Sequence, residues 1–145
     1  MSGGDIASTV GRRLILWRHG RTRYNAEDRF QGQSDTPLDR VGHEQAAAGA
    51  RLLVGLRPTS LITSDLSRAT QTAAELTRLS GLPAVEDPRL REHDVGQWAN
   101  LTGDQVAARF PSAYELWRTG SYPHHWEEPL GLARPQRDAG GQHDT

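Results

Sequence analysis

The strongest constraint on the fold of this chain is an alternation of short apolar runs with segments of helical spacing. The first run, residues 12–17, is nearly continuous, which is typical of an interior strand buried on both faces of a parallel sheet. A second run covers residues 59–63, and a third lies at 84–86 between two prolines. Strands that alternate with helices predict an α/β fold with a parallel sheet and right-handed crossovers.

Two long helices are expected between these strands. The first begins after Asp39, a residue type suited to an N-cap, and ends at Gly55, while the second stops at Gly81. We expect the first to bury a stripe of Val41, Ala48 and Leu52, and the second to bury Ala69, Ala73, Leu76 and Leu79. A capping box of Thr102 with Gln105 predicts a shorter helix that ends near Pro111, and residues 113–118 are expected to add further helical turns.

Length and composition limit the class of protein. A chain of 145 residues buries roughly 70% of its unfolded surface, which is enough for one core and one domain. The formal net charge is −1 with both signs intermixed, so neither nucleic acid nor a membrane surface is an expected partner. The chain has no cysteine, so disulfides and thiolate sites are excluded. Residues 1–13 are polar and no run approaches the ~20 apolar residues of a membrane helix, so we expect a cytoplasmic protein.

Composition also predicts the domain organisation. Residues 1–11 are expected to be a flexible N-terminus, and residues 12–120 a single domain. Residues 121–145 contain three prolines and several glycines and show no apolar periodicity, so we expect a disordered or unrelated tail there.

The first apolar run ends at the triplet Arg18-His19-Gly20, which suggests phosphate chemistry. A histidine is neutral and nucleophilic near neutral pH, and an adjacent arginine neutralises an incoming anion. Taken alone, the triplet is equally compatible with a strand end followed by a glycine turn.

Further motifs follow the triplet in the order Asn25, 29–38, 64–72, 90–92 and 96–98. Together they resemble the histidine phosphatase superfamily, also called phosphoglycerate-mutase-like, over about residues 12–120. Within it the chain is most similar to small bacterial phosphatases of the broad-specificity or sugar-phosphoglycerate type. The resemblance implies a three-layer phosphoglycerate mutase-like fold, a parallel sheet with flanking helices. The family continues with strands that include a second His-Gly pair, whereas this chain has only His19-Gly20, so we expect a domain missing its C-terminal strands.

The resemblance also assigns roles to residues. It implies that His19 is the nucleophile and that Arg18 and Arg68 clamp the phosphate, because guanidinium groups bind phosphate oxygens in a bidentate way. Arg68 is expected on the first turn of its helix, whose N-terminal amides would add donors for an anion. Glu92 occupies the place of the general acid, and a partly buried carboxyl there would hold a proton more readily.

Several other polar residues remain open. Asn25 and Gln31 fit either phosphate or loop contacts, or ordinary turn side chains. Arg21 replaces the glutamate or glutamine that is common in the family, a change that favours a substrate with a second anionic group. The remaining histidines lack metal-ligand spacing, so we predict neither a metal nor a cofactor; they are His43, His93, His124, His125 and His143.

These residues predict a phosphatase that hydrolyses small phosphorylated metabolites through a phosphohistidine on His19. A phosphomutase uses the same site and remains an alternative. Because the second His-Gly pair is absent, a phosphate-ligand binding module with impaired catalysis is a third hypothesis, and a truncated or frame-disrupted product a fourth. An incomplete sheet leaves an unpaired edge, which predicts self-association.

Overall fold

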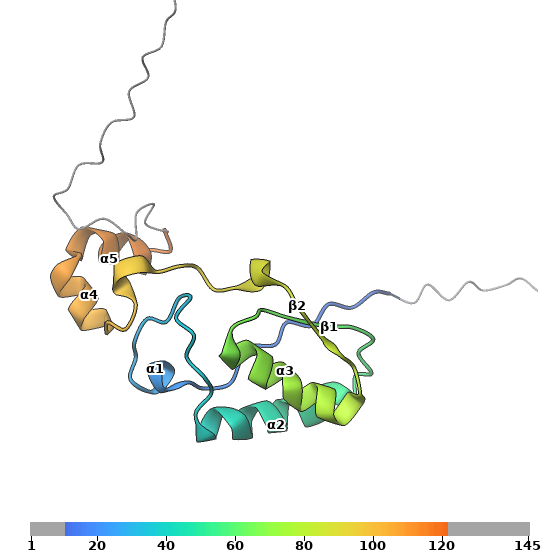
Figure 1. Cartoon of the computed structure of the whole chain (residues 1–145). Helices are drawn as coiled ribbons and strands as arrows, with labels where there is room; N and C mark the ends of the chain where they lie inside the picture. Colours follow the sequence, from blue (N-terminus) through green and yellow to red (C-terminus); the bar gives the residue numbers. More distant parts are fainter. Residues whose placement is uncertain (1–10, 122–145) are drawn as a thin grey trace, which may run out of the picture.

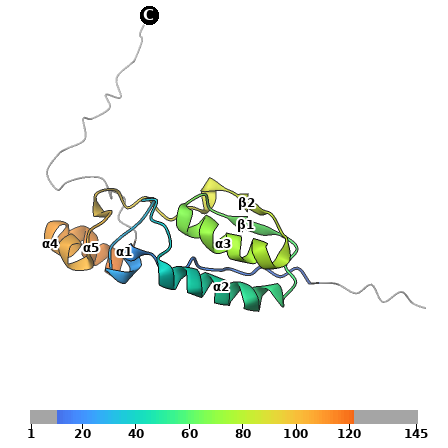
Figure 2. The ribbon, with the colours of Figure 1, turned by 60° about the horizontal axis from the view of Figure 1, so that its bottom comes forward.

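The computed structural model describes residues 11–121 (Figure 1). The elements in chain order are α1 (Arg23–Ala26), α2 (Arg40–Val54), β1 (Leu61–Thr63), α3 (Ser67–Ser80), β2 (Ala84–Glu86), α4 (Gly103–Arg109) and α5 (Pro111–Arg118). Short 3-10 turns lie at Pro88–Leu90 and Gly96–Trp98. Helix α3 packs against both α2 and the sheet (Figure 2). None of the helices described is long and apolar enough to cross a membrane.

The sheet described consists of two parallel strands joined through α3, as the alternation of elements predicts. The register pairs Leu61 with Ala84, Ile62 with Val85 and Thr63 with Glu86. The ladder continues past β2, where the Asp87 amide donates to the Thr63 carbonyl at 2.8 Å. The carboxyl end of β1 therefore delivers the chain directly to α3, the helix that carries Arg68.

The predicted helix ends are confirmed. The Asp39 carboxylate accepts a hydrogen bond from the Gly42 amide at 2.8 Å and so caps α2, which ends at Gly55. Gly81 ends α3 in the left-handed conformation, with φ of 76°. The capping box of Thr102 and Gln105 begins α4.

The expected first strand is wrong. Residues 12–17 take no part in the sheet described, and the side chains of Leu14 and Leu16 are 86% and 87% exposed. Trp17 does contact a neighbour, since a Cβ added to Gly49 of α2 would lie 2.9 Å from its indole nitrogen. An apolar run forms a buried strand only where other strands flank it. The run's own residues do not show whether such strands are present.

The buried stripe of α2 also differs from the prediction. Its buried residues are Gly42, Ala46 and Ala50, whereas Leu52 is 78% exposed. Small residues face inward because the segment around Gly20 approaches the helix backbone there. In α3 the predicted Ala73 and Leu76 are buried, but Leu79 is 38% exposed.

A hydrophobic core lies around Trp98, away from the sheet. Trp98 is packed among Val95, Val106 and Phe110, and the aromatic rings of Phe30, Tyr114 and Trp117 surround it. Phe30 is tied to this cluster by backbone hydrogen bonds, since its amide donates to Leu101 at 2.9 Å and its carbonyl accepts from Asn100 at 2.8 Å. This core therefore anchors the loop that begins at Gln31.

Candidate active site

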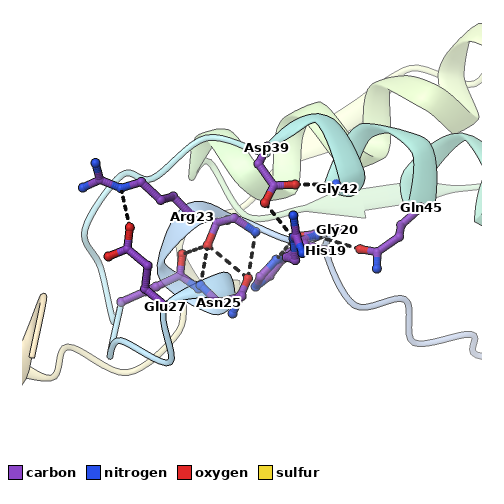
Figure 3. A network of polar contacts seen from close by, with 11 residues as sticks. His19, Gly20, Arg23, Asn25, Glu27, Asp39, Gly42 and Gln45 are labelled. Carbon is purple, nitrogen blue, oxygen red and sulfur yellow. Dashed lines mark hydrogen bonds and ion pairs between the residues drawn. The ribbon is translucent and has the colours of Figure 1, made fainter. Parts of the chain in front are cut away.

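His19 lies at the end of the extended segment, beside the first turn of α2. Its Nδ1 is 2.7 Å from the carbonyl oxygen of Gly20 (Figure 3). A carbonyl only accepts hydrogen bonds, so this contact places the proton on Nδ1. The other ring nitrogen, Nε2, therefore keeps its lone pair.

The surroundings of His19 favour the neutral imidazole. Burial lowers its pKa below the ordinary value of 6.5, and the nearby charges of Arg68 and Arg18 lower it further. The hydrogen bond to Gly20 and the carboxylate of Glu92 act in the opposite direction. The structure therefore brings four of the predicted site residues within electrostatic reach of one another: Arg18, His19, Arg68 and Glu92.

Arg68 is fixed in place by backbone carbonyls. It lies on the first turn of α3, as predicted, and is only 3% exposed. Its guanidinium donates to the carbonyl of Ser34 at 2.8 Å and to that of Gly32 at 2.7 Å. These bonds use two of its five N–H groups, which leaves others for an anion. An exposed arginine would lose more rotational freedom on binding phosphate than one already held in this way.

The N-terminal amides of α3 differ from the expectation. The Ser67 amide donates to Asp35 at 2.7 Å, and the Ser67 hydroxyl donates to the same carboxylate at 2.9 Å. The amides of Ala69 and Thr70 both bond to the Leu66 carbonyl. The chain's own carboxylate therefore occupies the anion position that the sequence suggested for a ligand.

Gly32 joins Arg68 to the segment that carries Glu92. Its φ is 53°, and a Cβ on it would lie 2.6 Å from the Val95 side chain and 2.9 Å from the His93 carbonyl. Only glycine fits this left-handed, crowded position. The carbonyl that holds Arg68 thus belongs to a residue packed against residues 93–95.

Glu92 is exposed, so the expectation of a partly buried carboxyl is wrong. Its backbone is nevertheless held on two sides. The Gln33 side-chain amide donates to the Glu92 carbonyl at 3.2 Å. On the other side, Arg91 forms a bidentate ion pair with Asp65 at the end of β1, with Nε 2.6 Å from Oδ1.

Asn25 and Gln31 meet at Thr22, a residue that the sequence did not single out. The Thr22 hydroxyl lies 2.7 Å from Gln31 Oε1, and the Thr22 amide donates to Asn25 Oδ1 at 3.0 Å. Both amide oxygens are turned toward Thr22, so both NH₂ groups point away from it. The signal available for Thr22 was the capping pattern of Thr22 with Asn25, three residues apart.

Arg21 has a structural partner. Its Nε is 2.7 Å from Asp39 Oδ2, and its amide donates to Gln45 at 2.9 Å. Arg21 therefore fastens the segment after His19 to the start of α2, and its interpretation as a receptor for a second anion finds no support in this geometry.

The described residues bring two guanidinium groups close to one oriented imidazole. They contain no group of three or more histidines, aspartates and glutamates arranged to hold a metal ion. Of the remaining histidines, His124, His125 and His143 lie outside the described residues, as does the predicted tail beyond residue 121. A neutral imidazole, two guanidinium groups and a carboxyl suffice chemically for transfer of a phosphoryl group.

An α/β domain with a histidine oriented among arginines is typical of proteins that bind or transfer phosphoryl groups. The comparison with protein families identifies which family this chain belongs to. The model of the histidine phosphatase superfamily (branch 1) matches residues 14–134, and the chain belongs to that superfamily.

Several relatives are similar over most of this chain. Glucosyl-3-phosphoglycerate phosphatase of Mycolicibacterium vanbaalenii is 44% identical over 84% of the chain and 55% of its own length. A probable phosphoglycerate mutase of Cronobacter sakazakii is 47% identical over 57% of the chain and 39% of its own length. The chain thus spans about half the length of the curated relatives it matches.

Solved structures agree with this assignment. A mycobacterial glucosyl-3-phosphoglycerate phosphatase in complex with VO3 matches with a TM-score of 0.66 and 44% identity, over 69% of this chain and 50% of that one. YhfR of Bacillus stearothermophilus matches with a TM-score of 0.68 and 31% identity, over 74% of this chain and 55% of that one. The arrangement of helices around the small parallel sheet is therefore that of the superfamily.

Proposed function

We propose that this chain hydrolyses small phosphomonoesters through a phosphohistidine formed on His19. The observation that carries the proposal is the contact of His19 Nδ1 with the Gly20 carbonyl, which leaves Nε2 as the attacking atom. Membership of the superfamily and the names of the phosphatase relatives support it.

In the first step, Nε2 of His19 attacks the phosphorus atom and the bond to the leaving oxygen breaks. Arg68 and Arg18 stabilise the charge on the equatorial oxygens, and the NH₂ groups of Asn25 and Gln31 add neutral donors. Glu92, as the acid, gives its proton to the leaving alkoxide, so that a free alcohol departs.

In the second step, water attacks the phosphohistidine. The Glu92 carboxylate takes a proton from this water, the P–N bond breaks, and inorganic phosphate and neutral His19 are released. The same two arginines serve both steps, because the phosphoryl group moves little between them.

The substrate class follows from the cations. Two arginines match the charge of one phosphate dianion, so the site suits a single phosphomonoester group. The names of the relatives direct attention to phosphorylated glyceric acids and their glycosides. If a second hydroxyl rather than water accepts the phosphoryl group, the same residues support the phosphomutase reaction.

The test is hydrolysis of an aryl phosphate by the full chain from mildly acidic to neutral pH, with His19→Ala and the control His43→Ala. His43 is an exposed histidine on α2. Turnover lost only in His19→Ala, with a phosphohistidine trapped by acid-free quenching of the wild type, supports the proposal. Equal turnover in wild type and His19→Ala overturns it. A folded chain that binds vanadate without turnover favours the binding module instead.

A further inference from the structure

Thr72 makes a pair of buried hydrogen bonds that the reaction does not explain. It lies on α3, one turn after Arg68, and is buried. Its hydroxyl donates to the Arg68 carbonyl at 2.7 Å and accepts from the Gly20 amide at 3.0 Å. One hydroxyl thus contacts the backbone of Arg68 itself and the backbone of Gly20, the residue after His19.

These bonds form one continuous chain from the clamp to the nucleophile. The Arg68 carbonyl accepts from Thr72, Thr72 accepts from the Gly20 amide, and the Gly20 carbonyl accepts from His19 Nδ1 at 2.7 Å. The Gly20 N–H and C=O belong to different peptide units, so what links the two bonds is the position of the Gly20 backbone, and the low local dielectric strengthens each bond. The bridge spans 52 positions in sequence between Gly20 and Thr72, so local structure does not supply it.

The same hydroxyl is not needed to hold the helix. A threonine that bonds to the carbonyl four residues earlier slightly destabilises a helix and often bends it. Thr70 makes a comparable bond to the Ser67 carbonyl at 3.1 Å without reaching any other segment. What distinguishes Thr72 is the second bond, to Gly20.

We propose that Thr72 is a positioning residue, whose hydroxyl fixes the Gly20 backbone and thereby the tautomer and place of His19 relative to Arg68. The proposal deepens the function proposed above and rests on it for its kinetic part. Thr72 touches neither the substrate nor the reacting atoms. Its substitution changes the fraction of His19 that is ready to attack, while the phosphate clamp stays in place.

The experiment compares Thr72→Val, Thr72→Ser and Thr77→Val in the full chain. Valine keeps the shape of threonine without the hydroxyl, and serine keeps the hydroxyl. Thr77 lies on the same helix, and its buried hydroxyl has no hydrogen-bond partner among the described residues. The readouts are kcat and KM for an aryl phosphate, and the His19 tautomer from imidazole ¹⁵N shifts, assigned by comparison with His19→Ala.

We expect Thr72→Val to lower kcat by about 10- to 100-fold, the effect of an unpaired buried donor, with a much smaller change in KM. Its His19 should lose the uniform Nδ1–H tautomer. Thr72→Ser should restore both readouts, and Thr77→Val should resemble the wild type. Unchanged kcat and tautomer in a folded Thr72→Val variant would overturn the proposal.

Failure of the proposed function gives a different result. If the wild type shows no turnover that depends on His19, but Thr72→Val alters the tautomer, the positioning role stands and the reaction does not. If Thr72→Val does not fold, the proposal is tested on the wild type by hydrogen exchange of the Gly20 amide and by the His19 tautomer. A Gly20 amide protected from hydrogen exchange beside an Nδ1–H tautomer supports the proposal. Rapid exchange of that amide or an Nε2–H tautomer overturns it.

Discussion

Gly20 and Gly42 are in contact through their backbones. A Cβ added to Gly20 would lie 2.2 Å from the Gly42 carbonyl oxygen, and a Cβ on Gly42 would lie 2.0 Å from the Arg21 carbonyl oxygen. Both distances are far below any tolerated contact, and both obstacles are backbone atoms. The segment after His19 therefore rests directly on the first turn of α2, held between that helix and α3.

Gly42→Ala is expected to damage both stability and activity. The added methyl must push the Arg21 backbone away from α2, and overpacking of this kind costs roughly 1–3 kcal/mol or more of the free energy of unfolding. The matched control is Gly55→Ala at the other end of the same helix, where a Cβ meets only the Leu52 carbonyl at 3.4 Å. Urea unfolding and turnover of both variants give the comparison, and equal stability of the two alanine variants contradicts the expected clash.

The pH dependence of kcat/KM is expected to report His19. The imidazole attacks only when neutral, and burial together with the Arg68 and Arg18 charges lowers its pKa, so the acid limb should lie below 6.5. Arg18→Gln removes a charge that lowers this pKa, so the acid limb should move to higher pH. Arg109→Gln, at the end of α4, serves as the control for the loss of one positive charge. A limb that moves down in Arg18→Gln, or equally in both variants, refutes the assignment.

The sequence predicted well what local chemistry determines. Asp39 and Gly81 end their helices because their own side chain or backbone freedom satisfies the helix terminus, and that information is local. The structure places Arg68 and Glu92 close enough to His19 for their charges to act on its pKa. The strand at 12–17 failed because its burial depends on neighbouring strands rather than on its own residues.

Thr72 and the small-residue stripe of α2 escaped prediction for a related reason. A threonine within a helix and a glycine at position 42 carry weak or unfavourable helix propensity and no apolar signal. Thr72 bonds to Gly20, and Gly42 lets the Arg21 backbone lie against α2. Both contacts join segments 20 or more positions apart in the chain. A usable signal for Thr72 was its place on the stripe of Arg68 and Leu76, every fourth residue along α3.

Glu92→Gln is expected to affect poor leaving groups most. A general acid matters when the departing alkoxide is a strong base and matters little for a nitrophenolate, which leaves without protonation. The loss in kcat should therefore be about 100-fold or more for an alkyl phosphate and much smaller for p-nitrophenyl phosphate. Glu86→Gln on exposed strand β2 controls for the change of charge. Equal losses on both substrates argue that Glu92 acts only through its charge.

Thr77→Val is expected to stabilise the fold. The buried Thr77 hydroxyl has lost its water without gaining a hydrogen bond in the described structure, and a methyl group of the same size removes that penalty. The free energy of unfolding should rise by about 1 kcal/mol. Thr70→Val, which deletes a hydroxyl bonded to the Ser67 carbonyl, should give no such gain in the same urea titration. A lower stability of Thr77→Val reveals a partner for that hydroxyl in solution.

The face of the sheet opposite α3 is expected to drive self-association. Ile62 and Val85 are paired in register on the two strands, and each is 59% exposed. Residues paired in this way point to the same side, so they form one apolar surface that a second copy can cover. Sedimentation velocity should show mass rising with concentration, and Ile62→Lys combined with Val85→Lys should suppress it. Leu52→Lys, at an exposed leucine on α2, should leave association intact. A wild-type chain that stays monomeric at all concentrations contradicts a self-complementary face.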